Sequence, residues 1–287
     1  MDWSEKEIRI KLTEKSWIQT TFFRPKENIL GAVMIAPATG IKRKFYDNFA
    51  RYLAQNQYAV ITYDNQGIGE SLSEDLRFCD IHITDWGLTD MPKVFEELKR
   101  LVPDVKYHLV GHSAGGQLVG LMHNWSDLTS IFNFACSSGS LKQMKIPFAW
   151  KARFFMNVFI PLSNALFGFT KTHWLGMGAP LPKGVAQEWR RWCNGSGYIQ
   201  VDLDKRIKKH FFNEVNLPSY WLNTSDDFIA NDRNVEEMIA VYPKLKPKRL
   251  HLVPSEYDLP YVGHMKFFAR QNEKLWPIAL DWIHTHD

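Results

Sequence analysis

Cysteine is scarce in this sequence. Among 287 residues there are only Cys79, Cys136 and Cys193, an odd number, far apart and without the CxxC spacing of zinc and redox motifs. Histidine and carboxylate residues also lack the clustered spacing of a zinc site. We therefore expect free thiols in a reducing compartment, with no disulfide framework and no metal.

The sequence also lacks a signal-peptide-like N-terminus and an unbroken apolar run of membrane length. Its first residues, MDWSEKEIRIKL, are charged, which predicts a cytoplasmic location. The aromatic stretch 146–169 is interrupted by Lys151, Arg153, Asn157 and Pro161, so no stable membrane span is expected. The net charge of +4 is too small to argue for or against nucleic acid or anionic membranes. We predict no nucleic-acid partner and leave the oligomeric state open.

Buried-strand patterns alternate with helical patterns through most of the chain. Near the N-terminus, Ile8 and Ile10 alternate with charged residues before a second strand at 16–23, which predicts an antiparallel hairpin. The further strands are expected at 31–38, 58–64, 106–111, 130–138, 219–227 and 248–254, and the helices at 45–56, 85–101, 117–122, 231–244 and 265–286. This order predicts an α/β fold with a mostly parallel, doubly wound sheet.

The alternation stops after Gly139 and resumes near residue 213. Residues 140–212 are rich in aromatic residues and contain no acidic residue before Glu188. We expect an inserted lid at 140–212 and a core built from residues 1–139 and 213–287. Within the lid, Phe154 and Phe155 are expected to contribute to an apolar wall that contacts substrate.

The stretch GHSAG, Gly111 to Gly115, surrounds one hydroxyl with residues that have almost no side chain. It lies between an expected strand and an expected helix, the setting of a nucleophile elbow with the pattern G-x-S-x-G. We expect Ser113 in a strained turn, with the residues two before and two after it approaching each other, so that only glycine fits there. The backbone N–H of Ala114, at the start of the helix, could then stabilise an oxyanion.

With this elbow, the chain resembles the α/β-hydrolase superfamily, and in particular bacterial lid-bearing serine hydrolases of the aminopeptidase and esterase type. The stretch YDNQGIGES, Tyr63 to Ser71, is similar to the D-x-x-G-x-G-x-S that follows a strand in that family. Gly67 and Gly69 could also suggest a dinucleotide-binding loop, but the third glycine and a P-loop lysine are missing. We therefore expect a structural turn at the rim of the site, and no cofactor.

The resemblance implies an acid and a base that follow the serine in the chain. In the family the base lies in the loop after the last strand, and His264 occupies that place. The acid should follow the preceding strand, where Asp226 and Asp227 both stand, and the family's pattern favours Asp227. Asp232 is expected to cap the next helix.

The second oxyanion N–H should come from the loop after strand 31–38. Many relatives have His-Gly there, whereas this chain has Pro37 and Ala38, so we expect Thr39 to be the donor, with Gly40 as the alternative. The basic run Lys42 to Lys44 follows and is expected to be solvated.

These residues predict a serine hydrolase that cleaves carboxylic esters or thioesters through an acyl-enzyme, with an apolar acyl group. The expected partner is a small-molecule ester, thioester or amide. A serine peptidase or amidase is the alternative within enzymes, and a non-catalytic binding protein of the same fold is the alternative outside them.

Overall fold

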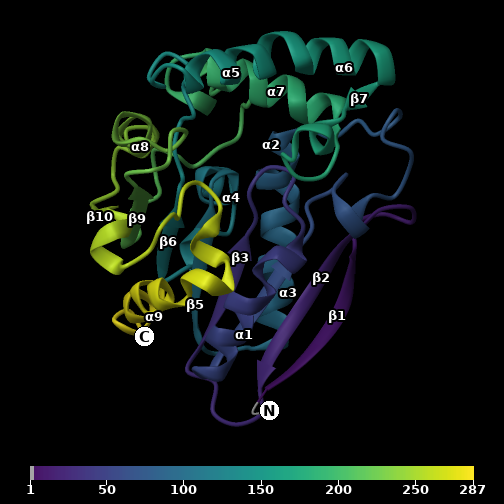
Figure 1. The fold of residues 1–287 in the computed structure, drawn as a ribbon. Coiled ribbons are helices and arrows are strands. Elements are labelled where there is room, and N and C mark those ends of the chain that lie inside the picture. Colours follow the sequence, from purple (N-terminus) through teal and green to yellow (C-terminus); the bar gives the residue numbers. More distant parts are fainter. Residues whose placement is uncertain (1–2) are drawn as a thin grey trace.

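An eight-stranded sheet runs through the computed structural model, which describes residues 3–287 (Figure 1). Its strand order is β1-β2-β4-β3-β5-β6-β9-β10. The pairs β1–β2 and β2–β4 are antiparallel, and the others are parallel. The strands are β1 (Trp3–Lys11), β2 (Trp17–Pro25), β3 (Gly31–Ala36), β4 (Tyr58–Tyr63), β5 (Lys106–His112), β6 (Ser130–Phe134), β9 (Ser219–Thr224) and β10 (Pro247–Leu252). The predicted N-terminal hairpin and the mostly parallel sheet are confirmed.

Helices cover both faces of this sheet. The core helices are α1 (Asp47–Gln55), α2 (Ile83–Asp85), α3 (Met91–Leu101), α4 (Ala114–Gln117), α8 (Asp232–Ile239) and α9 (Trp276–His284). On one face, Phe49 and Tyr52 of α1 contact Trp276 of α9, with ring centroids 5.6 and 5.3 Å apart. On the other face, the Tyr242 hydroxyl after α8 donates to the Gln117 carbonyl at the end of α4. This is the doubly wound arrangement that the alternating pattern predicts.

Three helices differ from their sequence predictions. The helix expected at 117–122 is α4, which ends at Gln117 and is followed by a 3₁₀ turn at Val119–Leu121. Three glycines at 115, 116 and 120 weaken this segment as an α-helix. The helix expected at 85–101 contains a π turn at Trp86–Asp90. The helix expected at 265–286 is helical only in its last part, because Pro277 stands in the first turn of α9 and 3₁₀ turns precede it.

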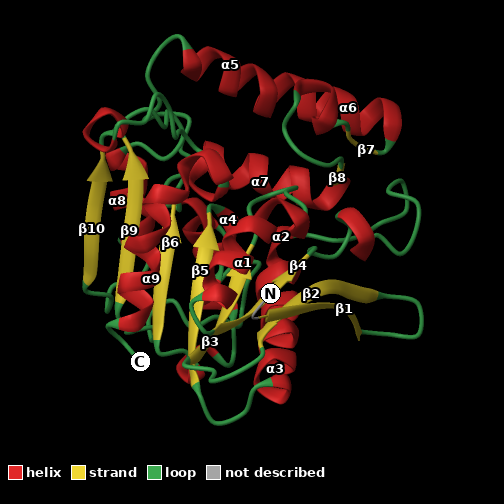
Figure 2. Cartoon of the chain, turned by 60° about the horizontal axis from the view of Figure 1, so that its bottom comes forward, coloured by secondary structure: helices red, strands yellow, loops and turns green. Residues whose placement is uncertain are grey.

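The segment 140–212 holds its own helices and a small antiparallel sheet. Its elements are α5 (Phe148–Phe154), a π turn (Phe155–Phe159), α6 (Ile160–Phe167), β7 (Phe169–Thr170), β8 (Leu181–Pro182) and α7 (Lys183–Asn194). Figure 2 shows the arrowheads of β5, β6, β9 and β10 pointing toward this segment. The inserted segment therefore lies over the carboxyl edge of the parallel strands.

Candidate active site

Ser113 lies in a sharp turn between β5 and α4. Its backbone has φ 49° and ψ −114°, which a residue with a side chain rarely adopts. A Cβ at Gly111 would stand 2.4 Å from the Gly116 Cα, and one at Gly115 would stand 2.1 Å from the Ala36 carbonyl oxygen. The nearest neighbour of a Cβ at Gly111 is thus Gly116, the residue bonded to Gly115, while a Cβ at Gly115 would meet β3. The need for glycine at both positions holds, because neither has room for a methyl group.

The loops after β5, β9 and β10 bring three predicted residues together. His264 Nε2 lies 3.1 Å from Ser113 Oγ, and His264 Nδ1 lies 2.7 Å from Asp227 Oδ2. The other Asp227 oxygen accepts the amides of Ile229 and Ala230, at 2.8 and 2.9 Å. The serine hydroxyl, the imidazole and the carboxylate therefore form one continuous hydrogen-bonded chain.

The environment of Asp227 keeps it ionised. Burial raises the pKa of this carboxyl, but the His264 ring and the two backbone amides favour the anion more, so the net pKa lies below its ordinary value. A carboxylate in this state can orient the imidazole and stabilise its cation.

Asp226, the alternative acid, binds main chain instead of the imidazole. Its two oxygens accept the amides of Val262 and Gly263, each at 2.9 Å. These amides belong to the loop that carries His264. Asp226 therefore anchors the loop of the histidine, while Asp227 contacts the ring.

Of the two predicted oxyanion donors, Ala114 is the first residue of α4 and Thr39 lies in the turn after β3. The amide of neighbouring Ala38 is already used, because it donates to the Tyr46 hydroxyl at 2.9 Å. Within residues 3–287, neither the Thr39 nor the Ala114 amide has a hydrogen-bond acceptor. Both amides are therefore available to a ligand.

A buried relay that the sequence did not reveal joins this turn to the other loops. The Tyr46 hydroxyl lies 2.8 Å from His112 Nδ1, and His112 Nε2 lies 2.8 Å from the main-chain oxygen of His264. A carbonyl only accepts, so Nε2 carries the proton and Nδ1 accepts from Tyr46. Burial, with a smaller contribution from nearby His264, lowers the pKa of His112 to about 3, so the ring stays neutral.

A buried ion pair supports the same rim. Arg43 donates from its amide and its guanidinium to Asp64, at 2.6 and 2.7 Å, and its guanidinium also reaches Glu7 and Glu70. Asp64 begins the DNQGIGES turn, so this turn is tied to the turn after β3. The prediction of a solvated basic run is wrong for Arg43, whose side chain is buried by these partners.

The chain is similar to known hydrolases in sequence and in fold. A family model described as serine aminopeptidase, S33, matches residues 24–170, just over half of the chain. The chain belongs to this family. The match includes Ser113 and ends before Asp227 and His264, whose placement comes from the structure.

Solved structures share the α/β-hydrolase fold of this S33 family member over nearly its whole length. They include a Thermogutta terrifontis esterase with malate bound, 14% identical with a TM-score of 0.58, over 98% of this chain and 100% of that one. A lipase in its open form is 14% identical with a TM-score of 0.66, over 98% and 99%. The thioesterase domain from the curacin biosynthetic pathway is 12% identical with a TM-score of 0.57, over 96% and 99%. No curated protein matches the sequence.

In this S33 family member, the two aromatic residues expected to contact substrate lie in different environments. Phe155 is buried inside the inserted segment, stacked on Phe159 and edge-on to Trp189. It packs the interior of that segment rather than a free wall. Phe154 is 59% exposed. Phe148, which no sequence pattern indicated, stacks its ring on Phe228, the residue after Asp227.

The inserted segment contacts the turn after β3 directly. The Ala179 amide donates to the Gly40 carbonyl at 2.8 Å, and a Cβ at Gly40 would meet the Leu181 side chain. Gly40 has φ 72°, a conformation that favours glycine. The loop that holds Thr39 is therefore fastened on one side by Tyr46 and on the other by the inserted segment.

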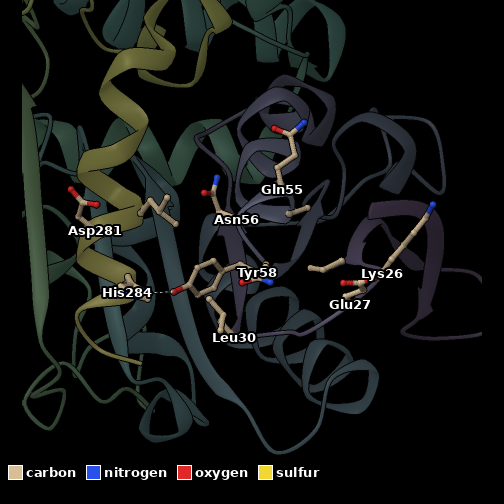
Figure 3. Close-up of a pocket in the computed structure, with 12 residues that line it drawn as sticks. Lys26, Glu27, Leu30, Gln55, Asn56, Tyr58, Asp281 and His284 are labelled. Carbon is tan, nitrogen blue, oxygen red and sulfur yellow. Dashed lines mark hydrogen bonds between the residues drawn. The ribbon is translucent and has the colours of Figure 1, made fainter. Parts of the chain in front are cut away.

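A hollow of about 580 Å³ lies at the opposite end of this hydrolase, where β3 and β4 begin (Figure 3). Its wall includes Lys26, Glu27, Tyr58 and His284, and it is far from the Ser113 loop because parallel strands separate the two ends.

Residues 3–287 contain no cluster of potential metal ligands and no helix long and apolar enough to cross a membrane.

Proposed function

We propose that this chain is a serine hydrolase that cleaves carboxylic esters or thioesters, with Ser113 as nucleophile, His264 as base and Asp227 as acid. The observation that carries the proposal is the hydrogen-bonded chain from Ser113 Oγ through both nitrogens of His264 to Asp227. An esterase, a lipase and a thioesterase domain among structures of the same fold support this substrate class.

The chemistry follows from the geometry. His264 Nε2 takes the Ser113 proton while Oγ attacks the carbonyl carbon, and the carbonyl π electrons move to its oxygen. The amides of Thr39 and Ala114 are the proposed donors to that oxyanion. Protonated His264 then gives its proton to the leaving alcohol or thiol. Water, deprotonated by His264, releases the acid and restores the serine.

We propose residues 140–212 as the lid and residues 1–139 with 213–287 as the catalytic core. The position of the inserted segment over the carboxyl edge and its contact with Gly40 support this division. Apolar residues in the segment suit an apolar acyl group. The cytoplasmic location stays a prediction.

An aminopeptidase is the second candidate, because the matching family model carries that description. Such an enzyme must bind the free α-ammonium of its substrate, which calls for an anionic partner. Residues 140–187, which form most of the proposed lid, contain no acidic residue. This favours the ester and thioester reading.

A fluorophosphonate probe tests the proposal, because it labels an activated serine whatever the natural substrate. The wild-type chain should be labelled, and Ser113→Ala should lose both labelling and p-nitrophenyl acetate hydrolysis. Ser225→Ala, an exposed serine in the loop of Asp227, is the matched control and should keep both. Full labelling of Ser113→Ala would overturn the assignment of the nucleophile, and an unlabelled wild type would favour a binding protein.

A further inference from the structure

The outer helix of the inserted segment and the turn before it expose a row of large apolar side chains. They occur at every fourth position from 146 to 166 and are between 40% and 73% exposed. The residues of this apolar stripe are Ile146, Trp150, Phe154, Val158, Leu162 and Leu166. Residues four apart drift by about 40° per step around an α-helix. The π turn at Phe155–Phe159 offsets part of that drift and keeps the stripe on one side.

The opposite side of the same helix is the one that packs inward. Phe155, Met156 and Ile160 are buried, and Phe155 contacts Trp189 of α7. In Figure 1, α5 and α6 form the outermost layer at the top of the molecule. The apolar stripe is therefore not part of the hydrophobic core of residues 3–287. A contiguous exposed apolar surface of this kind marks an interaction site.

Charge identifies the kind of partner. Residues 140–187 contain six basic residues and no acidic one, although the whole chain has a net charge of only +4. The basic residues are Lys142, Lys145, Lys151, Arg153, Lys171 and Lys183. Lys151 and Arg153 are exposed within the length of the stripe. The Lys171 ammonium lies 3.7 Å from the ring centre of Phe167 and 4.2 Å from that of exposed Trp174.

We propose that the apolar stripe docks on an anionic lipid surface, with α5 and α6 lying in the plane of the interface. Exposed tryptophan, phenylalanine and leucine beside basic residues are what an interfacial helix needs. A second copy of the chain fits less well, because two such faces would bring positive charges together. The inserted segment lies over the carboxyl edge of the sheet, so docking would turn the Ser113 side toward the lipid.

The proposal does not depend on the proposed hydrolase activity, so binding is measured directly. Full-length protein is mixed with vesicles of phosphatidylcholine alone or with about one-third phosphatidylglycerol, and the bound fraction is found by flotation. Binding should require phosphatidylglycerol and should weaken with added salt.

Two double variants separate the apolar and the charge contributions. Phe154→Ser with Leu166→Ser should lower the partition coefficient at least tenfold. Lys151→Gln with Arg153→Gln should lower it about tenfold, and only on anionic vesicles. Leu30→Ser is the matched control, because Leu30 is 42% exposed at the opposite end of the molecule, and it should bind like wild type. An unchanged circular dichroism spectrum and urea midpoint in solution check that the variants are folded.

Equal binding to both vesicle types would contradict the requirement for anionic lipid. Full binding by the Phe154/Leu166 variant would contradict the role of the apolar stripe. Absence of binding, together with a concentration-dependent dimer that the same variant abolishes, would make the apolar stripe a contact between two copies of the chain.

Discussion

In the sheet core, the polar side chains around the turn after β3 are buried and hydrogen-bonded, whereas in the inserted segment large apolar side chains face solvent. Arg43, Tyr46 and His112 are buried, and each has specific partners. Trp150 and Leu166 are well exposed. A buried polar group costs free energy whenever a partner is lost, while an exposed apolar group costs little when it is removed. A substitution should therefore cost much free energy of folding in the sheet core and little in the apolar stripe.

The largest effect should come from the acid. Asp227→Asn should lower kcat/KM for p-nitrophenyl acetate about 10⁴-fold, because it removes the charge and the tautomer control that His264 needs. Asp226→Asn should cost far less, because this residue contacts the loop amides and not the ring. The opposite ranking of the two variants would show that Asp226 is the acid.

Substitution of a core glycine should have the next largest effect. Gly115→Ala places a methyl group 2.1 Å from the Ala36 carbonyl oxygen, so the free energy of unfolding should fall by about 3 kcal/mol. Leu166→Ala, in the apolar stripe, should change it by less than about 0.5 kcal/mol. Urea denaturation measures both, and equal losses would break the contrast between the two regions.

Acid should destabilise the core through His112. Burial lowers its pKa to about 3 in the folded chain, whereas the unfolded ring titrates near 6.5, so the unfolded state binds more protons between these values. The free energy of unfolding should therefore fall as the pH drops below about 6.5, and the lowered pKa of Asp227 adds a loss at still lower pH. In His112→Asn the slope of stability against pH should be shallower, as urea midpoints at pH 7, 5 and 4 can show. Leu166→Ala should keep the wild-type slope.

Loss of the hydrogen bond between Tyr46 and His112 should have a smaller effect on the rate. Tyr46→Phe leaves the Ala38 amide and His112 Nδ1 without their partner, so we expect kcat/KM to fall about tenfold. The fall should be in kcat rather than KM, because the loops rather than the substrate contacts are loosened. An unchanged kcat in a folded variant would mean that the relay serves stability alone.

The smallest effect should come from the inserted segment. If its apolar residues hold the acyl group, kcat/KM for p-nitrophenyl esters should rise from acetate to medium chains, by up to about 0.8 kcal/mol per methylene. Phe154→Ala should leave that rise unchanged, because this side chain belongs to the exposed apolar stripe and not to the inward-packing side of the segment. A preference for acetate over every longer chain would favour a small pocket and the amidase alternative.

The core strands and the Ser113 turn could be predicted because their signals are local: β5 ends in a buried apolar run, and glycines surround the serine. The places of Asp227 and His264 came from the resemblance to the α/β-hydrolase superfamily, because β10, the strand before His264, is not a buried run. The Tyr46–His112 relay could not be predicted, because it joins residues 66 positions apart that only the fold brings together. The predicted N-cap of α8 is also wrong, because two neighbouring residues can each fill that position. Asn231, not Asp232, caps α8, while Asp232 binds His251.

The hydrogen bond from Ala179 to Gly40 bears on how far the two regions can evolve independently. It ties the inserted segment to the turn that holds Thr39, so exchanging the segment for another would also disturb that turn. A chimera that takes this segment from another hydrolase needs an equivalent main-chain donor at the place of Ala179 and a residue as small as Gly178 beside Gly40. Under the proposed function, substrate range and catalytic geometry would then be inherited together.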